Sequence, residues 1–371
     1  MPPRNLGPYE VLSVIGRGGI GTVYRARHRE SGNAVAVKLL GPPPACDPAA
    51  ARRLAREFEA LRGLHHPNVV RVHEAGVHEG YSFLAMELVE GLDLRSYLSP
   101  MLDDAPGGGD APCTGAHPLP STGGCGCDPG AWSDEPESQS LLTPAEGDPV
   151  AGADAIRAFA ALMDEPDTGP GPEPSCHEPA EGGRIGPVLA EAAPLSPALL
   201  ERLNRRGRLA RLHDAVLQVC EGLAYVHARG LVHRDLKPSN IMVDDRRWVR
   251  LMDFGLVKLA SDAASLTQHG KVVGTYRYMA PEQARGEPVD HRADLYSLGV
   301  ILFELLCGRP PFMARLAPEL WNEIIALPPP AVLAMNPGAP TRLALLANRL
   351  LAKDPRERFQ TAEEIAAELR R

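Results

Sequence analysis

The sequence predicts an α+β protein built from two unequal lobes: a small lobe with an antiparallel β-sheet and one main helix, and a larger lobe that is mainly helical. Alternating apolar runs fill the first hundred residues, and long helical patterns return only from Leu199 onward. The segment between them, residues 101–196, holds 15 Gly and 15 Pro, a density at which a packed fold is not expected. We therefore expect two lobes separated in sequence by a long insertion.

Five short runs in the small lobe predict strands. The runs Val11–Ile15 and Thr22–Ala26 flank a group of glycines, which is typical of a hairpin with a flexible tip. A β-rich run at 33–40 stops at a Gly-Pro-Pro-Pro sequence, and two further strands are expected at 69–73 and 81–88. Together these runs predict a compact, mostly antiparallel sheet.

Helices are expected where apolar residues recur every three or four positions. In the small lobe this holds for Pro48–Leu64, where Leu54, Phe58 and Leu61 share one face. In the larger lobe the pattern recurs in five stretches, Leu209–Ala228, Leu295–Leu306, Pro318–Ala326, Thr341–Leu351 and Thr361–Leu369. Within the insertion only Ala155–Met163 has it, so most of the insertion is expected to be disordered.

The net charge of −8 is unevenly distributed along the 371 residues. The insertion carries 17 acidic residues against two arginines, a net charge of −15, so the rest of the chain carries +7. No basic patch interleaved with aromatic residues points to nucleic acid, and no apolar run is long enough to cross a membrane or form a signal peptide. Seven scattered cysteines fit a reducing compartment, which favours a cytoplasmic protein without membrane or nucleic-acid partners.

The expected domain organisation follows from these patterns. A tail covers residues 1–8, the small lobe covers 9–90, and the larger lobe covers 91–371, interrupted by the acidic insertion at 101–196. The insertion could be an inert solvated loop, or its charge could sample the positive body and select substrates or basic partners. Charge screening beyond about 8 Å at physiological salt limits the second alternative.

The glycines of the first hairpin form a phosphate-binding pattern. Gly16, Gly18 and Gly21 give G-x-G-x-x-G followed by Val23. Dinucleotide-binding folds use similar glycines, but there the motif opens a helix, whereas here it joins two antiparallel strands. The context favours a backbone loop that covers nucleotide phosphates, with a ligand-free Gly-rich turn as the alternative.

Three further motifs complete a recognisable set. They are Val35-Ala36-Val37-Lys38, then His233-Arg234-Asp235-Leu236-Lys237-Pro238-Ser239-Asn240, and then Asp253-Phe254-Gly255. With the glycine loop, they resemble the eukaryotic-type (Hanks-type) Ser/Thr protein kinases, and in wording especially the bacterial members. The resemblance covers Tyr9–Leu98 and Leu199–Leu369, and it implies the bilobal protein kinase fold.

The resemblance implies an ATP-dependent transferase that phosphorylates Ser and Thr hydroxyls of proteins. Lys38 would hold the α- and β-phosphates of ATP and pair with Glu57 in the predicted helix, with Glu59 as a competitor for that role. Asp235 would orient the substrate hydroxyl and accept its proton, and Lys237 would neutralise charge on the transferred group.

The same resemblance implies a metal site and a nucleotide pocket. Asn240 and Asp253 would bind Mg²⁺, with Mn²⁺ as a possible substitute, because hard cations prefer oxygen ligands. Met86 would guard the back of the adenine pocket, and Asp93 would accept a hydrogen bond from a ribose hydroxyl. The remaining pocket residues are two that offer main-chain hydrogen bonds, Glu87 and Val89, and four that sandwich the base, Val23, Ala36, Met242 and Met252.

Control by phosphorylation is implied by Arg234, which precedes the catalytic Asp and can pair with a phosphate on the activation segment. Thr267 is the leading phosphosite, by autophosphorylation that could use a homodimer, with Ser265 and Ser261 as alternates. Thr275 is expected to position substrate.

Three residues are expected to have architectural roles. Glu282 and Arg358 match the buried ion pair of the family, and Asp294 matches the helix residue that anchors the catalytic loop.

Alternative functions stay open on the sequence alone. A pseudokinase scaffold would commonly lack one of Lys38, Asp235 and Asp253, all of which are present. A small-molecule kinase is disfavoured by the Ala280-Pro281-Glu282 segment, which protein substrates use for docking. A metal site formed by the cysteines of the insertion has irregular spacing.

Overall fold

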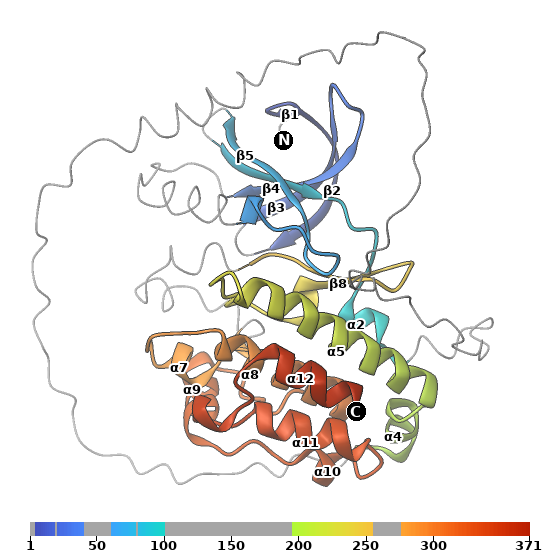
Figure 1. The fold of residues 1–371 in the computed structure, drawn as a ribbon, viewed down its shortest axis with the longest axis vertical. Helices are drawn as coiled ribbons and strands as arrows, with labels where there is room; N and C mark the ends of the chain where they lie inside the picture. The colour runs from blue at the N-terminus through green and yellow to red at the C-terminus, as the bar shows by residue number, and fades with distance from the viewer. Residues whose placement is uncertain (1–3, 19–20, 41–60, 79–80, 101–194, 255–275) are drawn as a thin grey trace, which may run out of the picture. The chain divides into compact units, whose positions relative to one another are not determined.

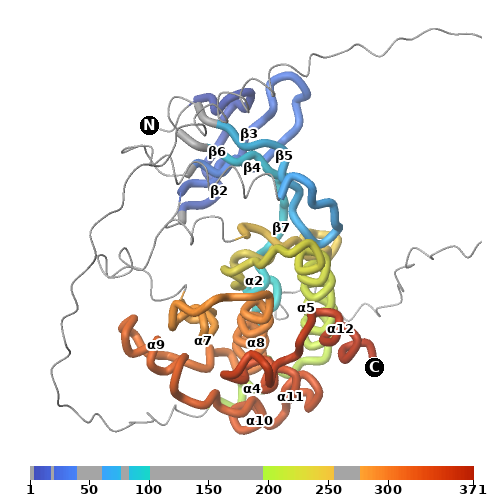
Figure 2. The backbone as a smooth tube through the Cα atoms, turned by 60° about the vertical axis from the view of Figure 1, so that its left-hand side comes forward, coloured from blue at the N-terminus to red at the C-terminus, as the bar shows by residue number. Residues whose placement is uncertain are grey.

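The computed structural model describes residues 4–18, 21–40, 61–78, 81–100, 195–254 and 276–371. Figure 1 shows the described strands β1 to β6 gathered on one side of helix α5 (Arg206–His227) and the other long helices on its far side. The turned view in Figure 2 keeps this separation of sheet and helices. The predicted division into a sheet lobe and a helical lobe is confirmed.

The small lobe is a six-stranded sheet whose neighbouring strands all run antiparallel, in the order β1-β2-β3-β4-β6-β5. Its strands are β1 (Asn5–Leu6), β2 (Tyr9–Gly18), β3 (Gly21–His28), β4 (Ala34–Leu40), β5 (Val72–His78) and β6 (Tyr81–Glu87). Alternation along β4 places Val35 and Val37 in one core with Phe83, and Ala36 in another core with Leu84. Strand β4 is therefore buried on both faces of the sheet.

Two strand boundaries differ from the sequence-based prediction. Residues 5–6 form β1 instead of belonging to a tail over 1–8, because Leu6 is fully buried in the core of the sheet. The strand expected at 69–73 begins only at Val72, because Val69 forms isolated bridges with His66 and Leu251.

The predicted helices of the larger lobe are all present within two or three residues of their expected ends. They are α5, α8 (Arg292–Cys307), α9 (Ala317–Ala326), α11 (Thr341–Leu350) and α12 (Ala362–Arg370), with shorter helices α2 (Leu94–Tyr97), α4 (Pro197–Leu203), α7 (Pro281–Ala284) and α10 (Val332–Met335). Helix α8 is buried along almost its whole length and packs on α11, and α12 packs on α5. The helices expected at 48–64 and 155–163 lie outside the described residues, apart from the last few residues of the first.

A small second sheet joins the two lobes. Its strands β7 (Gly91–Asp93), β8 (Ile241–Asp244) and β9 (Val249–Leu251) lie in sequence order. A side chain at Gly91 would place its Cβ about 2.1 Å from the carbonyl oxygen of Val243, so only glycine fits there. The sheet holds the chain segments that carry Asp93, Met242 and Asp253 near one another.

Asn68 links the sheet lobe to the second sheet by hydrogen bonds. Its side-chain amide donates to the carbonyl of Val249 and to Gln218, and its own carbonyl accepts from Leu251 N–H at 2.9 Å. The N–H of Val70 donates in turn to the Leu251 carbonyl. These bonds fix β9, and with it the start of the Asp253 segment, against the sheet lobe.

Arg208 holds the chain on both sides of residues 101–194. Its guanidinium is 1% exposed and donates to the carbonyls of Leu98, Leu203 and Leu305 at 2.7–2.9 Å. Because one side chain bonds to Leu98 and to Leu203, it links the chain segments that precede and follow the insertion. None of the helices in the described part of the chain is both long and apolar enough to span a bilayer.

Candidate active site

Three polar side chains converge in the loop before β8. The Asp235 Oδ2 atom accepts from Lys237 Nζ at 2.7 Å and from Asn240 Nδ2 at 3.2 Å. Asn240 Nδ2 also donates to the main-chain carbonyl of Asp235 at 2.8 Å. The short helix Pro238–Asn240 turns the chain so that these residues, up to five positions apart, face one another.

Asp294, in the first turn of α8, anchors this loop through main-chain hydrogen bonds. Its carboxylate is fully buried and accepts from the main-chain N–H groups of His233 at 2.7 Å and Arg234 at 2.8 Å. His227 Nε2 lies 2.9 Å from the same carboxylate. Arg234 has a φ of 62°, an uncommon conformation for a non-glycine residue, which these hydrogen bonds stabilise. The predicted role of Asp294 as the anchor of the catalytic loop is confirmed.

His233 connects the catalytic loop to the segment that carries Asp253. Its Nε2 lies 2.9 Å from the carbonyl of Met252, and its ring packs on Phe254 with 4.7 Å between centroids. Burial lowers the pKa of His233, despite the opposing effect of Asp294 and Asp235. His233 therefore links the loop that carries Asp235 to the segment that carries Asp253.

Lys38 and Asp253 meet although they are 215 positions apart in the chain. Lys38 lies on β4, Asp253 follows β9, and Lys38 Nζ is 2.9 Å from Asp253 Oδ1. The side chains are 11% and 28% exposed, so the pair is partly accessible to solvent. Asp253 has a φ of 53°, a second strained backbone position at this site. The structure thus brings the predicted phosphate-binding lysine and the predicted metal ligand into contact.

The predicted glycine loop is the turn of the β2–β3 hairpin. Gly16 lies opposite Val23 and Gly18 lies opposite Gly21, while the tip, residues 19–20, is outside the described residues. Val23 lies opposite Lys38 on the neighbouring strand β4. The hairpin therefore continues directly into the strand that carries the lysine.

Residues predicted for the nucleotide pocket lie at the junction of the sheet lobe and the second sheet. Ala36 and Met86 face each other across β4 and β6 and are nearly buried, and Val23, Val89 and Met252 pack partly buried against the same core. The main-chain N–H of Glu87 donates to the Arg71 carbonyl at 2.8 Å, so Glu87 would offer a ligand its carbonyl. Met242 pairs with Asp93 between β7 and β8.

The position of Asp93 differs in one respect from its expected role. Its two carboxylate oxygens accept from the main-chain N–H of Ser96 at 3.0 Å and from the Ser96 hydroxyl at 2.8 Å. Asp93 therefore caps helix α2, and a ribose hydroxyl would have to share the oxygens that perform this task. Glu57 and the phosphosite candidates Thr267, Ser265 and Ser261 lie outside the described residues.

The segment after residue 275 is fixed to the catalytic loop. Gln283 donates from Nε2 to the carbonyl of Arg234 at 3.0 Å, and Glu282 forms two hydrogen bonds with Arg358 at 2.7 and 2.8 Å. The predicted ion pair of Glu282 and Arg358 is confirmed. Arg234 Nε is buried and has no hydrogen-bond partner among the described residues.

One network near this segment was not predicted from the sequence. The hydroxyl of Tyr278 donates to Glu304 at 2.7 Å, and Arg95 contacts both Tyr278 and Glu304 at 2.6 Å. These three residues are so widely separated in the chain that no spacing rule connects them. Burial, together with Glu304, raises the pKa of Tyr278, which keeps its hydroxyl protonated.

The site combines two cations with oxygen-bearing side chains. Lys38 and Lys237 can neutralise phosphate charge, and Asp235, Asn240 and Asp253 supply oxygen atoms. Within the described ranges there is no group of three or more His, Cys, Asp or Glu side chains that could enclose a metal ion by themselves.

Comparisons with known proteins agree with this geometry. The sequence model of the family described as "Protein tyrosine and serine/threonine kinase" matches residues 9–369. The serine/threonine-protein kinase PknH of Mycobacterium tuberculosis is 28% identical over 97% of this chain and 41% of its own length. The serine/threonine-protein kinase pkn3 of Myxococcus xanthus is 30% identical over 97% of this chain and 49% of its own length.

Solved structures give the same fold. The crystal structure of the Mycobacterium tuberculosis PknI kinase domain superposes with a TM-score of 0.55 and 22% identity, covering 99% of this chain and 96% of that chain. The chain spans less than half the length of the curated relatives reported above. By the family match over 9–369, by its fold and by the convergence of its motif residues, this chain belongs to the protein tyrosine and serine/threonine kinase family.

Proposed function

We propose that this chain is a catalytic domain that transfers the γ-phosphoryl group of ATP to serine or threonine hydroxyls of proteins. The observation that carries the proposal is the 2.9 Å contact between Lys38 and Asp253, which joins the two lobes at the site. Kinases of this family use ATP, a divalent metal ion and protein substrates. The proposal concerns this domain, because the relatives are about twice its length or more.

The side chains present fit a magnesium ion. Asn240 donates from its amide nitrogen to Asp235, so its amide oxygen remains as the metal-binding atom, and Asp253 offers a carboxylate. Mg²⁺ typically takes one or two protein ligands and completes its octahedron with water and phosphate oxygens, and Mn²⁺ accepts the same donors. When bound, the metal would neutralise charge on the phosphates.

The chain's own residues would position and activate the acceptor. Lys38 would exchange its contact with Asp253 for the α- and β-phosphates of the nucleotide. Asp235 would orient the acceptor hydroxyl and take its proton, and Lys237, 2.7 Å from Asp235, would stabilise the negative charge of the transferred group. Positioning and charge neutralisation account for most of the catalysis in such a reaction.

Serine and threonine are the proposed acceptors because Lys237 is present in the loop Asp235-Leu-Lys-Pro-Ser-Asn240. In this respect the loop resembles the Ser/Thr branch of the family, whereas the tyrosine-specific branch lacks that lysine. Helix α7, which would dock the protein substrate, is bonded to the same loop through Gln283.

The proposal is tested by exchanging Asp235 for Asn. We expect Asp235→Asn to lower the rate of phosphate transfer to a protein mixture by at least about 10²-fold, because the base is lost while shape is kept. Asp245→Asn is the matched control, because Asp245 is an exposed residue in the turn after β8. Phosphosites would be identified by mass spectrometry. Equal activity of Asp235→Asn and Asp245→Asn would reject the proposal.

Autophosphorylation on Thr267 is a further part of the proposal, supported by the buried Nε of Arg234, which has no hydrogen-bond partner among the described residues. We expect Thr267→Ala to remove a phosphate from the intact mass of protein incubated with Mg-ATP and to lower its specific activity several-fold. Ser265→Ala and Ser261→Ala serve as controls. An unchanged phosphate count in Thr267→Ala would exclude this site, and concentration-dependent rates would indicate reaction between two copies.

A further inference from the structure

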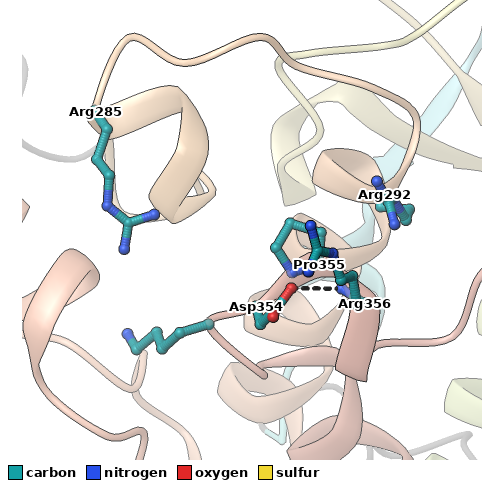
Figure 3. Close-up of a pocket in the computed structure, with 6 residues that line it drawn as sticks. Arg285, Arg292, Asp354, Pro355 and Arg356 are labelled. Atoms are coloured by element: carbon teal, nitrogen blue, oxygen red, sulfur yellow. Dashed lines mark hydrogen bonds between the residues drawn. The ribbon is translucent and has the colours of Figure 1, made fainter.

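A basic cavity of about 470 Å³ opens on the helical lobe, and none of the residues of the candidate active site lines it. Its lining consists of four cations, one acid and one proline, namely Arg285, Arg292, Lys353, Arg356, Asp354 and Pro355. Figure 3 shows Arg285 and Arg292 on opposite sides of the turn that carries Asp354. The lining has a formal charge of +3, which sets the cavity apart from a mixed, solvated surface.

The walls of the cavity are held together by the buried ion pair. Arg285 follows helix α7, which carries Glu282, and the segment of Lys353 to Arg356 leads directly to Arg358. The bidentate pair of Glu282 and Arg358 therefore joins two of the walls. Arg358 also donates to the main-chain carbonyls of Ala352 and Lys353. The main-chain positions of the residues that carry the cations are consequently fixed by the fold before any ligand arrives.

Two of the four cations have acidic partners beside them in sequence. Arg292 makes several contacts with Asp290, the shortest at 2.6 Å, and Arg285 lies 3.5 Å from Glu287. The Arg285 pair is long, and its side chains are 34% and 51% exposed, so it compensates little charge.

The other two cations lack such partners. Lys353 Nζ bonds to the carbonyls of Glu323 and Ile324 and lies 4.1 Å from the centre of the Phe312 ring, and among the described residues no carboxylate pairs with it. Burial, Arg285 and Arg358 lower the pKa of Lys353 to about 7. Arg356 is exposed, and its described hydrogen bonds are made by its main chain. The charge of Arg356, and that of Lys353 when it is protonated, is therefore not paired with a carboxylate among the described residues.

The charge and the number of donors in the lining favour a phosphate group over a single carboxylate. A phosphate monoester carries close to two negative charges at neutral pH and has three acceptor oxygens, so it can satisfy arginine and lysine donors from several walls together. Asp354 opposes an anion only partly, because its Oδ1 accepts from the N–H of Arg356 at 2.8 Å and caps the short helix Pro355–Glu357.

We propose that this cavity binds the phosphate group of a phosphoserine or phosphothreonine carried by a protein segment. Helices α7 and α9 pack on each other, and Lys353 bonds to the last turn of α9, so a phosphorylated segment seated here would lie beside the docking helix. The proposal rests on the proposed function only for the source of such phosphates, and the binding itself requires no catalysis.

The test measures binding of a fluorescent synthetic peptide with one phosphothreonine flanked by Gly and Ala, by anisotropy, to the full chain carrying Asp235→Asn. This background prevents turnover, so the outcome does not depend on whether the domain is an active kinase. We expect the peptide to bind at least about tenfold more tightly than its unphosphorylated form. Arg356→Gln and Lys353→Gln should each weaken binding about five- to tenfold, since each removes one charge-assisted contact.

Two control variants separate this cavity from other cations. Arg342→Gln removes a charge that is 40% exposed on α11 and lies outside the cavity, and it should leave the affinity unchanged. Arg234→Gln removes the cation expected to pair with a phosphate near the catalytic loop, and it should also leave the affinity unchanged. Arg356 is exposed, so Arg356→Gln should fold normally by circular dichroism and remain informative if Lys353→Gln does not fold.

Three outcomes would overturn the proposal. Equal binding of the phosphorylated and unphosphorylated peptides would show that phosphate is not recognised. Affinity that falls in Arg234→Gln and not in Arg356→Gln would place the phosphate near the catalytic loop. Inorganic phosphate binding as tightly as the phosphopeptide, with the same dependence on Arg356, would indicate a site for free anions and not for a protein segment.

Discussion

The ion pair of Arg358 and Glu282 is enclosed by protein, whereas the pair of Lys38 and Asp253 is partly open to solvent. The first pair has side-chain exposures of 0% and 7% and is bidentate, at 2.7 and 2.8 Å. The second has exposures of 11% and 28% and a single contact at 2.9 Å. Both join segments far apart in sequence, so the difference lies in how completely each charge is satisfied.

The environment of each pair indicates its task. Beyond its two bonds to Glu282, Arg358 donates to the carbonyls of Ala352, Arg292 and Lys353, so its donors are committed to the protein. Lys38 has one described partner, Asp253, so under the proposed function its ammonium group could leave that partner and contact a phosphate. The pair of Arg358 and Glu282, whose hydrogen-bonding groups are all used within the protein, therefore stabilises the fold. The pair of Lys38 and Asp253, with one contact and partial exposure, is available to exchange that contact for a ligand.

The largest effect on stability is expected at the enclosed pair. Arg358→Met should lower the free energy of unfolding by about 3–5 kcal/mol, because Glu282 would stay buried without its partner. Urea denaturation followed by circular dichroism measures this loss. Adding Glu282→Gln should recover part of it, since the uncompensated charge is then removed. A loss below about 1 kcal/mol in Arg358→Met would contradict the view that the pair is structural.

A smaller effect on stability, with a large effect on activity, is expected at the open pair. Lys38→Met should change the free energy of unfolding by no more than about 1 kcal/mol, because partly exposed pairs contribute little. It should lower phosphate transfer by about 10²-fold or more, through loss of phosphate neutralisation. Arg27→Met, on the adjacent strand β3, is the matched control for charge removal. If Lys38→Met were strongly destabilised and its folded fraction kept the unsubstituted rate of phosphate transfer, the pair of Lys38 and Asp253 would be structural and not part of the active site.

The contrast between these pairs also explains what the sequence can predict. Asp235, Lys237 and Asn240 lie within six positions, so one motif locates all three, and the structure brings them together through a short helix. The contact of Lys38 with Asp253 spans 215 positions and was not itself predicted. The family motifs pair Lys38 with Glu57, and they place Lys38 and Asp253 at one nucleotide site only when they are recognised together. The five long helices were predicted because helical periodicity, like the motif of Asp235 to Asn240, depends on residues that are close in sequence.

Features built from unrelated segments were not predictable. The strand at Leu6 depends on burial against the sheet, and the late start of β5 depends on the bridge of Val69 to Leu251. The network of Arg95, Tyr278 and Glu304 unites three distant segments, and no spacing in the sequence distinguishes its members from solvated side chains. Tertiary contacts decide these cases, so only the structure reveals them.

The smallest effect is expected from Lys353, which lies next to the enclosed pair and pairs with no carboxylate in the part of the chain that the structure describes. Its ordinary pKa of 10.5 applies to the unfolded chain, whereas burial, Arg285 and Arg358 lower the pKa of the folded chain to about 7. Between these values the unfolded chain binds more protons, so the free energy of unfolding should rise as pH increases from about 7 to about 8.5. We expect a rise below about 1 kcal/mol after solvent screening, measured by urea denaturation in phosphate-free buffer.

The pH range of this measurement stops at about 8.5 because burial raises the pKa of the Cys220 thiol, which adds a slope of opposite sign near pH 9. Lys353→Gln should abolish the rise and Arg342→Gln should retain it, whereas a rise of equal size in Lys353→Gln would assign the titration to another group.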